Sequence, residues 1–567
     1  MKQRLAMAAC LGTAAVLAGY GAFLLAQSAP MVHDLAPNPP VGSGMELAQG
    51  QASQYQLTES LRPASRPVQF GSLGLSAGGA ADIGNFRENV ANGYLPLHTD
   101  ITYEGLFAEY YFDTGSRTGC GALFCPSYSY AVSADPFSGD REYYLSVGLN
   151  SGLKEADFSR KDLNLVIVVD VSGSMDESFS TYHYDPPTAA PDTRTKIEIA
   201  SEAVAGLVDH LGPADNLGIV QFRDVARVVW PLESMASIDG EDLRAGIAGM
   251  HAVGGTNMDA GMDTATLMIG GAADGYENRI IFLTDAMPNL GDTSREGLLG
   301  AVSRNAESGI HTTFIGIGVD FNTQLVEELT KVRGANYYSV HSAAEFKSRM
   351  VDEFEFMVTP LVFDLELKLE ADGYDISAVY GSPEADRSTG EIMTVSTLFP
   401  SQTEGGQTKG GIILLKLERV SDDAVLVLSA TYTGADGEPG ENRVAVGIGP
   451  HDTDYYENTG VRKGALLARY ADLMKAWILD ERATLANVTT GRPSYDDDGI
   501  RAPMYTAGTL GPWERQSAPV QVSDRYAGPI SQFREYFEAE AAAIGDQTLR
   551  QELEILAGLA RLADPGG

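Results

Sequence analysis

The stretch Leu165-Val-Ile-Val-Val169 is followed directly by Asp170-Val-Ser172-Gly-Ser174-Met175. A continuous apolar run of this length is typical of a β-strand that is buried on both faces, as in parallel sheets covered by helices. Asp170, Ser172 and Ser174 then stand at alternate positions of a tight loop. Ligands of open parallel sheets bind beyond the carboxyl ends of the strands, so this loop marks the expected position of a functional site.

Strand-like and helix-like blocks alternate from residue 161 to residue 360. After the first strand, apolar residues recur at helical spacing from Ile197 to Leu211, and Gly212-Pro213 ends that pattern. Further strands are expected at residues 217–222, 226–230, 279–284, 311–317 and 336–340, and helices near residues 241–250, 257–269, 293–308, 322–333 and 342–357. This alternation predicts an α/β fold with a doubly wound, mostly parallel sheet and helices on both faces.

The regions around the α/β block have different patterns. Residues 84–160 contain short alternating stretches and predict a β-rich segment, while residues 361–452 contain clean period-two runs and predict an antiparallel β-sandwich. Residues 453–567 carry apolar stripes at helical spacing, which predict a C-terminal helical region. Residues 29–83 are rich in Ser, Gly, Pro, Gln and Ala and predict a low-complexity linker.

Residues 1–28 predict export, because Lys2 and Arg4 precede an apolar run from Leu5 to Ala26. This run fits a signal peptide that is cleaved, and it is also long enough to remain as a membrane anchor. Both alternatives stay open. We therefore expect a protein that is periplasmic or secreted, or that is anchored in the membrane by this segment.

Composition limits the class of protein further. A chain of 567 residues is longer than one hydrophobic core supports, so several domains are expected. The 77 acidic residues outnumber the 40 basic ones, and the net charge of -37 argues against binding to nucleic acid. Cys120 and Cys125 lie close together in an exported chain and predict a small local disulfide.

Two more loops are expected to reach the sheet edge marked by Asp170. Thr256 stands in Gly254-Gly255-Thr256-Asn257 at the start of a predicted helix, and Asp285 directly follows the predicted strand 279–284. With Ser172 and Ser174, these loops supply hydroxyl and carboxylate oxygens. Such hard oxygen donors suit Mg²⁺, Ca²⁺ or Mn²⁺ better than Zn²⁺.

The order and spacing of these five residues resemble the metal-ion-dependent adhesion site of von Willebrand factor type A domains. The stretch Asn92-Gly-Tyr-Leu-Pro96 is also similar to one that precedes the domain in bacterial cell-envelope proteins of this type, and the flanking β regions resemble the architecture of inter-alpha-trypsin inhibitor heavy chains. The resemblance implies metal coordination by three hydroxyls, with two carboxylates near the metal directly or through water. The residues concerned are Asp170, Ser172, Ser174, Thr256 and Asp285.

The same resemblance implies that one coordination position stays open for an Asp or Glu of a protein partner. We therefore expect a metal-dependent protein-binding module at the cell envelope. The chain departs from the family pattern in two places. Ala286 stands where the family commonly has Gly, and residues 176–195 form a long insertion beside the first motif. Asp176, Glu177 and Asp185 in this insertion offer extra ligands or a gate over the site.

Two other functions are weighed against this prediction. In the first, the domain is a structural scaffold of an envelope complex, and metal only stabilises the fold. In the second, Gly74-Leu-Ser76-Ala-Gly78 is the nucleophile elbow of a serine hydrolase. The pattern around Ser76 predicts neither the buried strand before an elbow nor the helix after it, so we do not expect an enzyme.

Overall fold

Strand β7 (Leu163–Asp170) lies inside a seven-stranded sheet, and all of its residues are buried. β7 pairs in parallel with β10 on one side and with β8 on the other, as its continuous apolar run predicts. Only β9, among the described strands of this sheet, runs antiparallel to its neighbour. The strands lie in the order β2 (Gly79–Ala80), β12 (Asn336–Val340), β11 (Ile310–Ile317), β10 (Glu277–Thr284), β7, β8 (Asn216–Phe222) and β9 (Ala226–Ser234).

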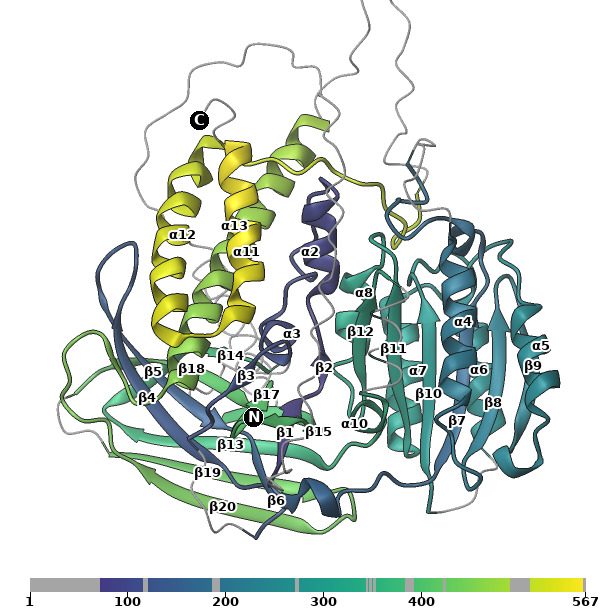
Figure 1. The fold of residues 1–567 in the computed structure, drawn as a ribbon, viewed down its shortest axis with the longest axis horizontal. Coiled ribbons are helices and arrows are strands. Elements are labelled where there is room, and N and C mark those ends of the chain that lie inside the picture. Colours follow the sequence, from purple (N-terminus) through teal and green to yellow (C-terminus); the bar gives the residue numbers. More distant parts are fainter. Residues whose placement is uncertain are drawn as a thin grey trace, which may run out of the picture. The chain divides into compact units, whose positions relative to one another are not determined.

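Helices cover both faces of this sheet (Figure 1). On one face, side chains of α4, α5 and α10 form a core with the odd-numbered residues of β7, such as Ile167. On the other face, α6, α7 and α8 pack around even-numbered residues such as Val168. The predicted doubly wound α/β fold is therefore confirmed. The bounds are α4 (Lys196–Val208), α5 (Gly240–Ala248), α6 (Met258–Ile269), α7 (Arg295–Glu307), α8 (Thr323–Leu329) and α10 (Phe354–Val358).

The computed structural model describes residues 72–115, 121–185, 194–270, 275–342, 345, 349, 353–382, 392–421, 425–489 and 510–563. The predicted export segment at residues 1–28 lies outside these ranges. Within them, no helix combines the length and the apolarity that crossing a bilayer requires. Cys125 is disulfide-bonded, and its expected partner Cys120 lies outside the described residues.

Two antiparallel sheets form the predicted β-sandwich, and strands from both sides of the α/β block build them together. The six-stranded sheet has the order β20-β19-β13-β15-β1-β6, and the five-stranded sheet has the order β14-β18-β5-β4-β21. A smaller sheet joins β16, β17 and β3. Their bounds are β1 (Ser72–Ala77), β3 (Tyr111–Phe112), β4 (Ser127–Ala134), β5 (Arg141–Gly148), β6 (Asn150–Lys154), β13 (Val362–Asp372), β14 (Tyr374–Tyr380), β15 (Ile392–Ser401), β16 (Thr403–Glu404), β17 (Gln407–Lys409), β18 (Ile412–Arg419), β19 (Val425–Gly434), β20 (Pro439–Val446) and β21 (Tyr455–Tyr456).

Residues 72–80, which the sequence placed at the end of the linker, are ordered strands. β1 pairs with β15 and β6, and β2 pairs with β12 of the α/β sheet. Leu73 and Leu75 are fully buried on β1. The small Gly and Ser residues that resembled a linker here permit close packing, since a Cβ at Gly74 would overlap the side chain of Thr408.

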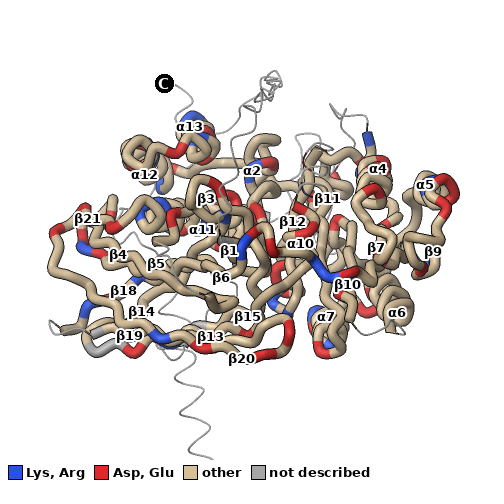
Figure 2. The backbone as a smooth tube through the Cα atoms, turned by 60° about the horizontal axis from the view of Figure 1, so that its bottom comes forward, with Lys and Arg blue, Asp and Glu red and all other residues tan. Residues whose placement is uncertain are grey.

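The helical region consists of α11 (Thr459–Thr489), α12 (Asp524–Ile544) and α13 (Arg550–Ala563), which share a core with α2 (Gly84–Ala91) and α3 (Tyr103–Ala108). The predicted apolar stripe of α11 is buried, and Trp477 at its centre has no exposed surface. Acidic positions lie on the α/β region, on the β-sandwich and on the helical region (Figure 2). The negative charge is thus a property of the general surface, and it does not by itself mark a site.

Candidate metal centre

The three predicted loops meet at the carboxyl end of β7 and β10. The two strands are in register, with Val169 beside Leu283, so Asp170 and Asp285 leave the sheet at the same edge. Backbone bonds then join the first loop to the one that carries Thr256. The Val253 N–H donates to Val171 O at 2.8 Å, and the Gly173 N–H donates to Gly254 O at 2.9 Å.

Short hydrogen bonds fix the side chains of the first loop. The Ser172 N–H donates to Asp170 Oδ1 at 2.8 Å, and the Thr284 hydroxyl donates to Asp170 Oδ2 at 2.6 Å. The hydroxyl oxygens of Ser172 and Ser174 lie 3.1 Å apart. The structure therefore places Asp170 behind the loop, where it holds Ser172 and the end of β10 in position.

All five predicted site residues are buried, and Asp170 and Asp285 have no exposed surface. Burial and the charge of Asp285 raise the pKa of Asp170 to about 7. One carboxylate oxygen, Asp285 Oδ1, is buried without a hydrogen-bond partner among the described residues. A buried carboxylate oxygen of this kind is costly unless a cation or a water binds it.

A buried lysine lies next to Asp285, and the sequence analysis missed it. Lys196 Nζ donates to Asp285 Oδ2 at 3.1 Å and to Asp320 Oδ1 at 2.5 Å, and none of the three side chains is exposed. Burial lowers the pKa of Lys196, but the charges of Asp320 and Asp285 outweigh this effect and raise it. The pKa of Asp320 is raised by burial in spite of Lys196.

Lys196 is the first residue of α4, where a Thr195 capping box starts the helix. It stands four residues before Ala200 and eleven before Leu207, both of which are buried on the sheet-facing side. This spacing puts Lys196 on the apolar face of an amphipathic helix. A charged residue at such a position is the feature of the sequence from which a buried lysine could have been predicted. With Asp170, Asp285 and Asp320, the cluster carries three acidic groups and one basic group.

Ala286 adopts a left-handed backbone conformation with a φ of 55°. This conformation is easy for glycine and costs an alanine roughly 1–2 kcal/mol, which explains why a glycine suits the turn. The Ala286 N–H donates to the Thr284 hydroxyl at 2.9 Å, and the Ala286 methyl group is buried. The turn therefore forms with alanine, at some cost in backbone strain.

Residues 176–185 of the insertion pack against the domain. Phe179 is buried in the same core as β7, and the Tyr182 hydroxyl donates to Asn89 Oδ1 at 2.6 Å. Asp176 and Glu177 are exposed. The Asp185 carboxylate accepts hydrogen bonds from the N–H and the hydroxyl of Ser517.

The residues present fit a hard divalent cation. Hydroxyls of Ser172, Ser174 and Thr256 and the unpaired Asp285 oxygen are oxygen donors on neighbouring loops. In the described residues, no three side chains of His, Cys, Asp or Glu are close enough to hold a metal ion by themselves. A cation at this edge would therefore depend on the serine and threonine hydroxyls.

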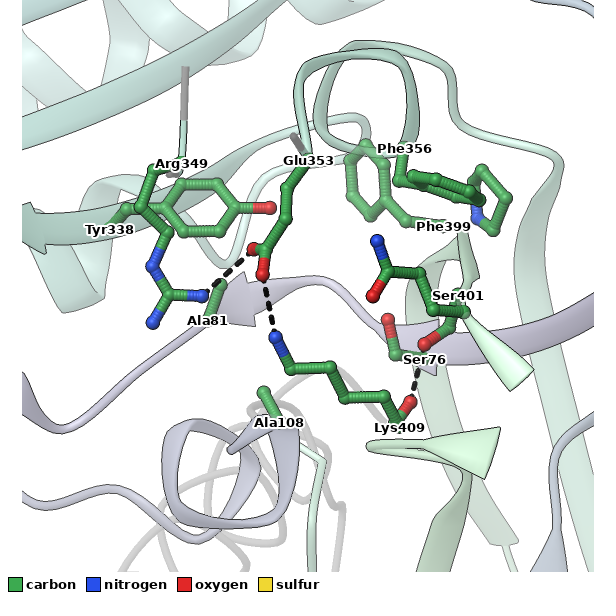
Figure 3. A pocket seen from close by; sticks show the side chains of 12 residues that line it. Ser76, Ala81, Ala108, Tyr338, Arg349, Glu353, Phe356, Phe399, Ser401 and Lys409 are labelled. Atoms are coloured by element: carbon green, nitrogen blue, oxygen red, sulfur yellow. Dashed lines mark hydrogen bonds and ion pairs between the residues drawn. The ribbon is translucent and has the colours of Figure 1, made fainter. Parts of the chain in front are cut away.

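Ser76 lies in a different place from a nucleophile elbow. It stands inside β1 opposite Phe399, and it lines a pocket with Glu353 and Lys409 (Figure 3). The Lys409 ammonium donates to Glu353 at 2.7 Å. No histidine is present among the described residues that line the pocket. Ser76 therefore lies within a strand of the sandwich, whereas a nucleophile elbow lies at a sharp turn between a strand and a helix.

The family match lies within the α/β region of this chain. Residues 165–287 match a family model described as von Willebrand factor type A domain. The chain is 27% identical over 207 residues to inter-alpha-trypsin inhibitor heavy chain H4 of Homo sapiens, which is 35% of this chain and 20% of that protein. It is 25% identical over 209 residues to the uncharacterized protein YfbK of Escherichia coli, covering 36% of this chain and 33% of that protein.

A solved structure titled von Willebrand factor type A from Catenulispora acidiphila covers 69% of this chain and 94% of its own length, with 16% identity and a TM-score of 0.40. The chain spans no more than a third of the length of the two curated relatives named above. The matched residues 165–287 contain most of β7 and the loops after β7 and β10. All five predicted site residues lie in this range, namely Asp170, Ser172, Ser174, Thr256 and Asp285.

Proposed function

Because this chain carries a von Willebrand factor type A domain, we propose that it is a protein-binding module whose capture of a partner depends on a divalent cation. Domains of this family commonly mediate protein–protein interaction. The finer proposal is that Ser172, Ser174 and Thr256 hold Mg²⁺, Ca²⁺ or Mn²⁺, with Asp170 and Asp285 close to the cation. An Asp or Glu of the partner would complete the coordination.

The observation that carries this proposal is the unpaired oxygen of Asp285. Asp285 Oδ1 is buried beside a loop whose hydroxyls lie 3.1 Å apart, while Oδ2 is bonded to Lys196. An unsatisfied carboxylate oxygen in a buried site is expected to have a cation or water as its partner. Asp170, which has a raised pKa, would also be stabilised in its charged form by a cation.

A bound cation would supply a positive charge that attracts a partner's carboxylate. The protein's own residues do the rest. Asp170 holds the Ser172 N–H and the Thr284 hydroxyl, so the loop keeps its shape without rearrangement. Lys196 offsets part of the charge of Asp285 and Asp320, which lowers the negative charge that a dication must balance before it can attract a partner's carboxylate.

The proposal also includes export of the chain from the cytoplasm. Residues 1–28 would direct the chain out of the cytoplasm, either as a cleaved signal peptide or as a membrane anchor, and the module would act at the cell envelope. Partner class and place of action both belong to the proposal, since the matched relatives share only part of their length with this chain.

The contacts of Lys196 favour a second candidate function, that of a structural scaffold in which metal only stabilises the fold. Its ammonium already offsets part of the negative charge beside Asp285, so the fold has an internal counter-charge. The two functions differ in what metal removal does to partner capture. A scaffold keeps its partner after the metal is removed, whereas a metal-dependent module releases it.

The test uses the Ser174→Ala variant, with Ser178→Ala as the control. Ser174 and Ser178 are both buried serines of the same segment, and Ser178 Oγ contacts Ser180 Oγ away from the predicted donors. Calorimetric titration with Mn²⁺ should show binding weakened about tenfold or more by Ser174→Ala, which corresponds to about 1.4 kcal/mol. Ser178→Ala should bind Mn²⁺ like the wild type.

Partner capture is then measured with the full chain on beads in an envelope extract, with Mg²⁺ or with EDTA. Captured proteins should be lost with EDTA and reduced in Ser174→Ala to the same extent as metal binding. Capture that survives EDTA while Mn²⁺ binding is lost would refute metal-dependent binding and support the scaffold.

A further inference from the structure

The segment of residues 511–519, here called the strap, lies across the loops at the candidate metal edge. Figure 1 shows it as part of the yellow coil that leads into α12. Trp513 Nε1 donates to Thr293 O at 2.8 Å, beyond the end of β10. Asn322 Nδ2 donates to Trp513 O at 2.8 Å, beyond the end of β11. The strap is thus fastened to two loops at the carboxyl ends of the parallel strands.

The strap places a carboxylate at the rim of the site. Glu514 Oε1 accepts hydrogen bonds from the Tyr184 hydroxyl at 2.5 Å and from Asn289 Nδ2 at 2.9 Å. Asn289 Oδ1 in turn accepts from the Thr256 N–H at 2.8 Å. A single side chain, Asn289, therefore links Glu514 to one of the predicted metal-binding loops.

Tyr184 joins Glu514 to the insertion. Burial, the hydrogen bond to Glu514 and the charge of Glu514 raise the pKa of Tyr184, and the charge of Asp285 contributes in the same direction. The Tyr184 hydroxyl therefore contacts the strap carboxylate directly. Glu514 and the Thr256 loop therefore share Asn289 as a hydrogen-bond partner.

The donors that bond to Glu514 are uncharged. Besides Tyr184 and Asn289, the Gly511 N–H donates to Glu514 Oε2 at 2.6 Å. A half-buried carboxylate held only by neutral donors is attracted strongly by a nearby cation, because the local dielectric is lower than that of water. Glu514 thus has the chemistry that the proposed function assigns to the partner.

The strap also holds the insertion beside the first motif. Gln516 Nε2 donates to Tyr184 O at 2.7 Å, and Ser517 donates to Asp185 through its N–H at 3.0 Å and its hydroxyl at 2.6 Å. Its far end is fastened by a bond from the Leu95 N–H to Ala518 O at 2.7 Å. The strap and residues 184–185 are therefore joined, and release of one would loosen the other.

We propose that the strap is an internal competitor of the partner, with Glu514 presented to the cation-binding edge in place of the partner's Asp or Glu. Partner capture then requires displacement of the strap. This inference rests on the proposed function, since a competitor has meaning only where a cation binds carboxylates. It assigns the gate to residues 511–519, which are hydrogen-bonded to Tyr184 and Asp185 of the insertion.

The test compares Glu514→Gln with Glu538→Gln, an exposed residue of α12 that matches the change in charge. Hydrogen exchange of the amides of residues 511–519 is measured in the full chain with EDTA and with saturating Mg²⁺. In the wild type and in Glu538→Gln, Mg²⁺ should slow this exchange at least threefold. In Glu514→Gln, the exchange should be fast in both conditions.

A second arm uses a blocked pentapeptide, Gly-Ser-Asp-Ser-Gly, and its Asn counterpart as probes. At millimolar concentration with Mg²⁺, the Asp peptide should restore fast exchange in the strap of the wild type, and the Asn peptide should not. The inference is wrong if Mg²⁺ does not change the exchange rate of the strap amides, or if Mg²⁺ slows this exchange equally in Glu514→Gln.

Calorimetry with Mg²⁺ on the same samples separates the two proposals. If Mg²⁺ binds and the strap does not respond, only the internal competitor is wrong. If the wild type binds no Mg²⁺, the proposed function fails, and the competitor fails with it.

Discussion

Replacement of Lys196 by methionine should destabilise the fold more than the loss of any surface ion pair. Lys196 Nζ lies 3.1 Å from Asp285 Oδ2 and 2.5 Å from Asp320 Oδ1, and all three side chains have no exposed surface. Methionine fills nearly the same volume, so the cost comes from two buried carboxylates that lose their counter-charge. Breaking a buried pair from one side costs about 3–5 kcal/mol.

The assay is urea unfolding at pH 7 in EDTA, with Lys331→Met as the control. Lys331 pairs with Glu327 and Glu328, but its side chain is 30% exposed. Its loss should change the free energy of unfolding by no more than about 1 kcal/mol. Equal losses in the two variants would refute the account of the Lys196 cluster.

Magnesium provides a second readout of the same variant. Without Lys196, the carboxylates of Asp285 and Asp320 repel each other, and a cation near Asp285 relieves part of that repulsion. Mg²⁺ should therefore stabilise Lys196→Met more than it stabilises the wild type. An equal gain in both proteins would show that the cation does not sense this cluster.

Two further predictions concern single residues away from the candidate donors. Burial raises the pKa of Glu104 from 4.5 to about 7. Between these pH values the native state binds more protons than the unfolded chain. The free energy of unfolding therefore falls as pH rises, by about 3 kcal/mol in all. Glu104→Gln should therefore stabilise the protein at pH 8 and have little effect at pH 4.5, and a difference that is the same at both pH values in urea unfolding would contradict this. Thr195→Ala removes the acceptor of the Glu198 N–H in the capping box of α4 and should cost about 1 kcal/mol in the same assay, whereas no loss would show that the cap is dispensable.

Local patterns were sufficient to predict the α/β sheet. The apolar run at 165–169 became β7, and the helical spacing after Lys196 became α4, because burial on one or both faces imposes a period that is visible in the sequence. The prediction that the three loops meet at one edge then followed from the rule that ligand sites lie at the carboxyl ends of parallel strands.

Contacts between distant segments were beyond this reasoning. β5 pairs with β18 although Leu145 and Leu415 are 270 residues apart, and alternation within a strand says nothing about its partner. Lys196 was missed for a related reason, because its partners Asp285 and Asp320 come from other strands' ends. The strap has no periodic pattern, so its position over the site could be learned only from the fold.

The most direct test of the central claim is the stability of the wild-type chain after EDTA treatment and after addition of Mg²⁺, Ca²⁺ or Mn²⁺. A cation that binds only the folded protein should raise the free energy of unfolding by about 2.7 kcal/mol at 100 times its dissociation constant. The account predicts this gain for at least one of the cations, and its loss in Ser174→Ala. No gain with any of the three would contradict the claim that this edge of the sheet is a metal-dependent binding site.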